Sequence, residues 1–157
     1  MSLKHKTVRI ALGLVSWLVL TAGLGLPAWA ALGDLEASVS SDSVKLKASP
    51  RVISRPSFTV HEMQTPAGTV IREFVAASGV VFAISWQGPF KPDMNLLLGR
   101  YFGTYASAPR SAGSTRSRLM IEQPALIVHA GGHMRAFAGI AYVPQLLPAG
   151  VTEGDLQ

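Results

Sequence analysis

The chain has 157 residues, a formal net charge of +5 and no cysteine. That length accommodates one domain, and the lack of cysteine excludes disulfide bonds, so an apolar core must stabilise the fold. Lys4, Lys6 and Arg9 lie within the first thirty residues, and without them the net charge is only +2. The basic character is therefore weak evidence for a nucleic-acid partner, and we expect none.

Residues 1–30 have the pattern of a secretory signal peptide. A basic start precedes an uncharged apolar run, Ile10 to Leu26, and Ala28 and Ala30 stand where a signal peptidase requires small residues. The alternative is an uncleaved membrane anchor, but the run is short for a transmembrane helix and contains three glycines. We expect cleavage after Ala30 and a periplasmic or secreted protein. Its only contact with the membrane would be through this peptide, before cleavage.

Residues 31–57 are polar and serine-rich, and part of this segment is expected to be mobile. Within it, Val44–Lys47 alternates apolar and basic residues, which is typical of a short edge strand. The single domain is expected over residues 58–151. Residues 152–157 form a C-terminal tail, and Leu146 and Leu147, which precede it, are expected to pack back on the domain.

Residues 58–86 predict three antiparallel strands joined by two hairpin loops. The separators Pro66–Gly68 and Ala77–Gly79 both end in a glycine, which fits a three-residue loop whose last residue has a positive φ. These loops predict which residues face each other across the strands: Glu62 and Arg72, His61 and Glu73, Val60 and Phe74, Phe74 and Phe82, Arg72 and Ile84. One face then becomes a core face, formed by Val60, Val70, Phe74, Val80, Phe82, Ile84 and Trp86.

A helix is predicted from Pro92 or Asp93 to about Tyr105. Its apolar positions recur at helical spacing and should pack on the core face of the sheet: Met94, Leu97, Leu98, Tyr101, Phe102 and Tyr105. The following segment, residues 106–118, is rich in serine, glycine and proline, so we expect a solvated loop. Its arginines offer an alternative, a basic contact patch formed by Arg110, Arg116 and Arg118.

Residues 119–143 predict further strands, with Gly131–Gly132 as a two-residue hairpin loop. That loop would place His129 opposite Met134, and His129 and His133 on opposite faces of the sheet. Two histidines so arranged cannot bind one ion, and the chain has no cysteine to complete a site. We therefore expect no metal site. We also expect no cofactor, because the sequence contains no phosphate-binding loop and no dinucleotide-binding motif.

Few residues are candidates for a functional site. Glu62 and Arg72 form a cross-strand charge pair at the margin of the core face, where the arginine could anchor a carboxylate or phosphate. Arg135 is expected on an apolar strand face, with Glu122 as one possible partner, and His133 is expected beside the turn. We take Arg72, Glu62, Arg135 and His133 as candidate ligand-binding residues.

The alternative site is catalytic and uses His61 and Glu73. This pair resembles a general base oriented by a carboxylate, but it has no evident nucleophile. It would require a concave pocket around His61.

Three segments carry a resemblance to a known family: TPAGTVIREFVAASGVVFAISWQGP, PDMNLLLGRYF and GGHMRAFAGIAYVPQLLPAGV. Over about residues 31 to 151 the chain resembles the bacterial family called domain of unknown function 2844. The resemblance implies a small exported bacterial protein with a single domain. It supplies no catalytic residue.

The predicted fold is α+β, a mostly antiparallel sheet of about five to seven strands with one main helix packed on one face. The expected function is that of a non-enzymatic binding module. Its partner would be another exported or envelope protein, or a small ligand. The alternatives are an enzyme that uses His61 and Glu73, and a metal-binding protein that uses His129 and His133.

Overall fold

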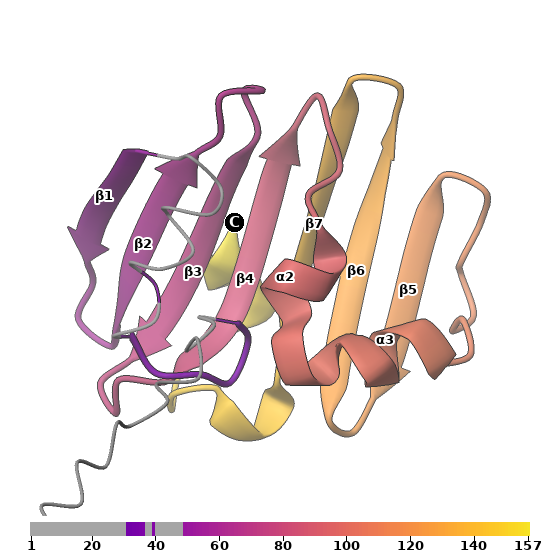
Figure 1. Cartoon of the computed structure of the whole chain (residues 1–157). Coiled ribbons are helices and arrows are strands. Elements are labelled where there is room, and N and C mark those ends of the chain that lie inside the picture. Colours follow the sequence, from indigo (N-terminus) through magenta and orange to yellow (C-terminus); the bar gives the residue numbers. More distant parts are fainter. Residues whose placement is uncertain (1–30, 37–38, 40–48) are drawn as a thin grey trace, which may run out of the picture.

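A computed structural model of the chain describes residues 31–36, 39 and 49–157. The described residues form one antiparallel sheet of seven strands in the order β1-β2-β3-β4-β7-β6-β5 (Figure 1). The strands are β1 (Ser49–Ser54), β2 (Phe58–Gln64), β3 (Val70–Ala76), β4 (Val81–Gly88), β5 (Arg118–Gln123), β6 (Leu126–His133) and β7 (Ala136–Tyr142). The predicted α+β class and antiparallel sheet are confirmed. No strand was predicted at the position of β1, and the strand expected at Val44–Lys47 lies outside the described residues.

The two loops of the meander form as predicted. Gly68 and Gly79 have φ angles of 86° and 78°, and each N–H closes its loop by donating to the carbonyl three residues earlier. The predicted pairing of β2 with β3 is confirmed, including Glu62 with Arg72 and His61 with Glu73. The turn residues therefore determine this register, because each loop has a defined length and closing bond.

The register between β3 and β4 differs from the prediction. Val75 pairs with Val81, but Phe74 then pairs with Ala83 because the register shifts at this point. Phe82 is the extra residue of the resulting β-bulge. The predicted pairing of Phe74 with Phe82 is wrong.

This bulge reverses the faces of the residues that follow in β4, because side chains alternate along a strand. Arg72 pairs with Ser85, so the predicted pairing of Arg72 with Ile84 is also wrong. Ile84 and Trp86 lie on the opposite face from Phe74. All six residues from Val81 to Trp86 are buried, which shows that β4 is covered on both faces.

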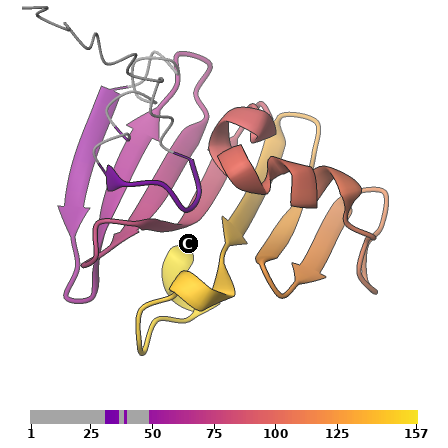
Figure 2. The same ribbon diagram turned by 60° about the horizontal axis from the view of Figure 1, so that its bottom comes forward.

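The sheet separates two apolar clusters, and each defines one face. We call the first the helix face, because its cluster joins Met63, Ile71 and Trp86 to residues of the helical segment. We call the second the C-terminal face, because its cluster joins Phe74 and Phe82 to Leu156. Figure 2 shows the helices and the C-terminal segment on opposite sides of the sheet. The helix was predicted to pack on the face that carries Phe74 and Phe82. Its apolar residues join the cluster on the opposite face, so that prediction is wrong.

The helical segment comprises α2 (Met94–Leu98), a 3₁₀ turn (Gly99–Tyr101) and α3 (Phe102–Ser107). Its predicted start is confirmed, since the Asp93 side chain accepts hydrogen bonds from the N–H groups of Asn95 and Leu96. The helix is interrupted at Gly99, whose φ is 46°. A side-chain carbon at this position would collide with Ala31.

The second hairpin turns at a different place from the one predicted. His133 pairs with Ala136 and Gly132 with Phe137, so Met134 and Arg135 form the loop while both glycines lie within β6. Arg135 takes the positive φ of the turn, 66°. A Cβ on Gly132 would lie 2.8 Å from the Cα of Phe137, so this glycine permits the close approach of β7 instead of forming the turn.

The C-terminal segment, residues 144–157, packs on the sheet and is not a free tail. Leu156 is fully buried, and Leu146 and Leu147 pack against the core as predicted. A capping box between Thr152 and Asp155 begins the final 3₁₀ helix, η4 (Glu153–Leu156). Across the residues that the structure describes, no helix has the length and apolar character needed to span a membrane.

Candidate functional site

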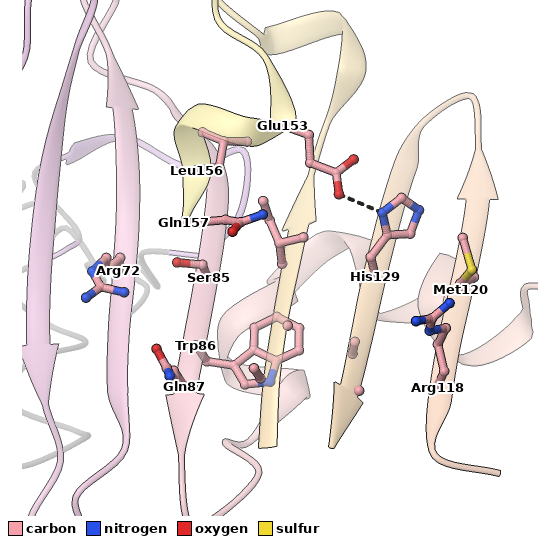
Figure 3. A pocket seen from close by; sticks show the side chains of 15 residues that line it. Arg72, Ser85, Trp86, Gln87, Arg118, Met120, His129, Glu153, Leu156 and Gln157 are labelled. Atoms are coloured by element: carbon pink, nitrogen blue, oxygen red, sulfur yellow. Dashed lines mark hydrogen bonds and ion pairs between the residues drawn. The ribbon is translucent and has the colours of Figure 1, made fainter. Parts of the chain in front are cut away.

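A cavity of about 540 Å³ lies on the C-terminal face. Figure 3 shows Arg72 at one side of it, Arg118 and Met120 at the other, and Glu153 and Leu156 reaching in from the C-terminal segment. The cavity therefore brings together β3 at one side, β5 at the other, and the last residues of the chain.

The order of the strands explains the position of the cavity. One row of paired residues crosses the sheet beneath it: Glu62, Arg72, Ser85, Ile140, His129 and Met120. In the adjacent row Ala138 and Gly131 lie between Gln87 and Arg118. These two small residues leave space above the strands. The row on the other side contains Phe74 and Tyr142 and lies in the core that includes Leu156.

Arg72 is held at the edge of the cavity by its predicted partner. Its Nε donates to Glu62 Oε2 at 2.9 Å, and the two side chains are 29% and 24% exposed. The predicted Glu62–Arg72 pair is therefore present. No other hydrogen bond of the Arg72 side chain occurs among the described residues, so its terminal nitrogens remain available to a ligand.

Ser85 lies next to Arg72 in the same row and also lines the cavity. The residue is only 6% exposed, and its Oγ is buried without a hydrogen-bond partner among the described residues. Buried hydroxyl groups nearly always form hydrogen bonds, and one left without a partner requires an explanation. A ligand in the cavity would supply that partner.

His129 links the sheet to the C-terminal segment. Its Nδ1 lies 2.8 Å from Glu153 Oε1, and because a carboxylate only accepts, Nδ1 is the donor of this bond. Its Nε2 is buried, 3.5 Å from Glu122 Oε1, and forms no hydrogen bond within the described part of the chain. Glu153 also accepts from the Tyr142 hydroxyl at 3.3 Å. Burial, followed by the charge of Glu153, raises the pKa of Tyr142 above its usual value.

These groups do not form a metal site. Glu122 and Glu153 lie on the two different ring nitrogens of His129, so their carboxylates do not converge. Among the residues placed by the structure, no cluster of three or more histidine or acidic side chains could hold a metal ion. His133 is exposed at the end of β6, with Nδ1 3.3 Å from the carbonyl oxygen of Met134.

The prediction that His129 and His133 lie on opposite faces is wrong. They are four residues apart in a continuous strand, so alternation places them on the same face. At the rise of a strand their backbones are about 13 Å apart, which is too far for both to bind one ion.

Arg135 does not contribute to this cavity. It is exposed in the hairpin loop, so its predicted position on an apolar strand face is wrong. Its suggested partner, Glu122, lies beside His129 instead. The ligand-binding roles of Arg135 and His133 remain predictions without support from their positions.

The catalytic alternative, His61 and Glu73, lies on the helix face. The imidazole Nε2 of His61 is 2.9 Å from Glu36 Oε1, and Glu73 is fully buried. Neither residue lines the cavity of the C-terminal face. His61 and Glu73 are paired across β2 and β3 as predicted, but the carboxylate that contacts the His61 ring is that of Glu36.

Sequence reasoning found Arg72 but missed most of this site. Ser85 was missed as a site residue, because the bulge that places it beside Arg72 has no signal in the sequence. Glu153 was assigned to a tail, although Thr152 and Asp155 form a capping pattern that indicates local order. The alternation of Arg118, Met120 and Glu122 on β5 could have indicated a half-polar face.

Together, the fold and site define a small α+β protein in which a ligand-sized cavity lies between a seven-stranded sheet and its C-terminal segment. The family model described as Protein of unknown function (DUF2844) matches residues 28–156. The chain therefore belongs to the DUF2844 family, which confirms the resemblance seen in its sequence. No curated protein matches the chain, and no solved structure matches it.

Proposed function

We propose that this protein is an exported, non-enzymatic module that binds a small ligand in the cavity of the C-terminal face. The volume of about 540 Å³ falls in the range of small-molecule sites. One observation carries the proposal: Ser85 Oγ is buried, lines this cavity and has no hydrogen-bond partner among the described residues. Each unsatisfied polar group costs on the order of 1–3 kcal/mol, which a suitable ligand would partly recover.

The lining favours a ligand with an acidic group and an apolar body. The acidic group fits beside Arg72 and Ser85, where guanidinium nitrogens and a hydroxyl are adjacent. Ile140, Met120 and Leu156 provide apolar contacts beyond them. We therefore infer a small organic acid as the class of ligand.

Binding is favoured over catalysis because the nitrogens of His129 are directed at carboxylates. Glu153 accepts from Nδ1, and Glu122 lies beside Nε2, where a general base would have to meet its substrate. Ile140 stands between Ser85 and His129 in the row. Two strand spacings separate the backbones of Ser85 and His129 by about 10 Å, too far for the histidine to activate the hydroxyl directly.

Export is part of the same proposal and rests on residues 1–30, which have the pattern of a signal peptide. We expect the protein to be recovered from the periplasmic or secreted fraction with Ala31 as its first residue. Mass spectrometry of the intact protein from each fraction tests this. A cytoplasmic protein that retains Met1 would contradict export but not ligand binding.

The ligand is tested with a cavity-filling variant. Wild-type protein, purified as the cell produces it, is screened by thermal shift against small mono- and dicarboxylic acids, and hits are measured by calorimetry. Ala138 lines the cavity, so Ala138→Leu should weaken binding at least about tenfold. Ala136→Leu is the control, since this exposed residue of the same strand lies outside the lining.

Two results would contradict the proposed ligand site. One is equal affinity of the Ala138→Leu and Ala136→Leu variants for a hit. The other is a screen without any hit, combined with native mass spectra that show no small molecule retained by the purified protein.

A further inference from the structure

A second cavity, of about 240 Å³, shares part of its lining with the first and differs from it in charge. It lies by the loop before β5, and four of its lining residues are basic: Lys91, Arg110, Arg116 and Arg118. No aspartate or glutamate lines it. Arg118 lines both cavities, as do Trp86, Ala130, Gly131 and Ala138.

These four cations have no anionic partner in the described part of the chain. The ion pairs found there involve other basic residues, namely His61, Arg72, Arg100 and His129. Lys91 donates from Nζ to the hydroxyl of Tyr105 at 3.1 Å, a neutral acceptor that leaves the charge uncompensated. The cavity therefore concentrates positive charge.

The loop that carries the arginines is attached to the edge of the sheet by hydrogen bonds. Ser111 donates its N–H to the carbonyl of Met120 at 2.8 Å, and Met120 donates its own N–H to Ser114 Oγ at 2.9 Å. Gly132 donates to the carbonyl of Ser117 at 3.1 Å. These bonds hold the backbone from which Arg110 and Arg116 project, so the loop is more than the solvated connection expected from its composition.

We propose that this cavity binds a phosphoryl or sulfuryl group, as a site separate from the organic-acid site. Guanidinium groups match the oxygens of such tetrahedral anions, and Thr115 and Ser117 add hydroxyls to the same wall. The volume suits one or two such groups. An anion would also reduce the repulsion among the four like charges that line this cavity. The group could belong to a soluble ester or to a lipid headgroup, because both present the same oxygens.

The first test uses pyrophosphate as the probe, in calorimetry at low ionic strength on the protein purified as the cell produces it. Arg110→Ala and Arg116→Ala should each weaken binding about tenfold or more, and added salt should weaken the wild type. Arg55→Ala, an exposed arginine outside both linings, should bind as the wild type does. Wild-type affinity in both loop variants, or no binding of pyrophosphate at millimolar concentration, would overturn the proposal.

Melting temperatures separate a ligand role from a structural one. Without anion, Arg110→Ala and Arg116→Gln should melt at or above the wild-type temperature, because each removes one of several repelling charges. With pyrophosphate, the wild type should gain stability and the variants should gain less. If both variants melt lower without anion, the arginines serve the loop itself and the proposal is wrong.

Vesicles distinguish the two sources of the group. Binding to phosphatidylglycerol vesicles that pyrophosphate displaces would identify a lipid headgroup, and pyrophosphate binding without vesicle binding would identify a soluble ester. Vesicle binding that neither pyrophosphate nor Arg116→Ala weakens would count against this site. Arg72→Ala changes only the larger cavity, so it should impair organic-acid binding and leave pyrophosphate binding unchanged. The two proposals can thus fail separately.

Discussion

Replacing Leu156 by alanine tests whether the C-terminal segment is an integral part of the fold. Leu156 is fully buried in the cluster that contains Phe74 and Phe82, although it is the second-last residue of the chain. The substitution removes three carbons, worth about 2.4 kcal/mol at about 0.8 kcal/mol for each buried methylene. A residual cavity would add to this, whereas relaxation of the nearby chain end would reduce it. We expect a loss of about 2–3 kcal/mol in the free energy of unfolding.

Equilibrium urea unfolding measures this loss, with Leu35→Ala as the control. Leu35 is 63% exposed, so its truncation should change the free energy of unfolding by less than about 0.5 kcal/mol. Equal, small effects of the two substitutions would refute the reasoning. They would mean that the last residues do not pack on the C-terminal face in solution and that the larger cavity lacks one wall.

Three further predictions concern single residues. Arg135 has a φ of 66°, which is strained for a residue with a side chain, so Arg135→Gly should raise the free energy of unfolding by about 1 kcal/mol. Urea unfolding measures this change, and a loss of stability would show that the turn is not strained. Asp93 caps the helical segment, so Asp93→Ala should cost about 1 kcal/mol, while Asp93→Asn should cost less. The pKa of Tyr142 is raised in the folded protein, so the folded protein keeps a proton that the unfolded chain loses near pH 10. The stability that this group contributes is therefore complete below pH 10 and is lost as pH rises through the folded pKa. Tyr142→Phe should reduce that alkaline fall in melting temperature, and an unchanged fall would exclude this origin.

Local signals predicted the parts of the fold that depend on a few neighbouring residues. Gly68 and Gly79 take the positive φ that their loops require, and the first of these loops determined the register of β2 with β3. Asp93 marks the start of the helical segment because a side-chain carboxylate can accept from free N–H groups of the first turn. The Glu62–Arg72 pair at the edge of the cavity followed directly from that register.

Glycine alone was an ambiguous signal in the second hairpin. Gly131–Gly132 has the composition of a two-residue turn, yet the chain turns at Met134–Arg135. Gly132 is required within β6 because β7 approaches closely and because its φ of 135° is a conformation that other residues rarely adopt. This shift of the turn reassigned Arg135 to a loop and altered the face predicted for His133.

The sequence by itself determined the antiparallel meander, the helix start and the Glu62–Arg72 pair, because turn chemistry and capping act over a few bonds. Only the tertiary structure decided which face Ser85 and Trp86 occupy, because one bulged residue, Phe82, reverses the alternation of β4. It also decided that Glu153 meets His129, a contact between residues 24 positions apart. The cavity depends on both decisions, since its polar groups converge only after the strands are paired and the C-terminal segment has folded over them.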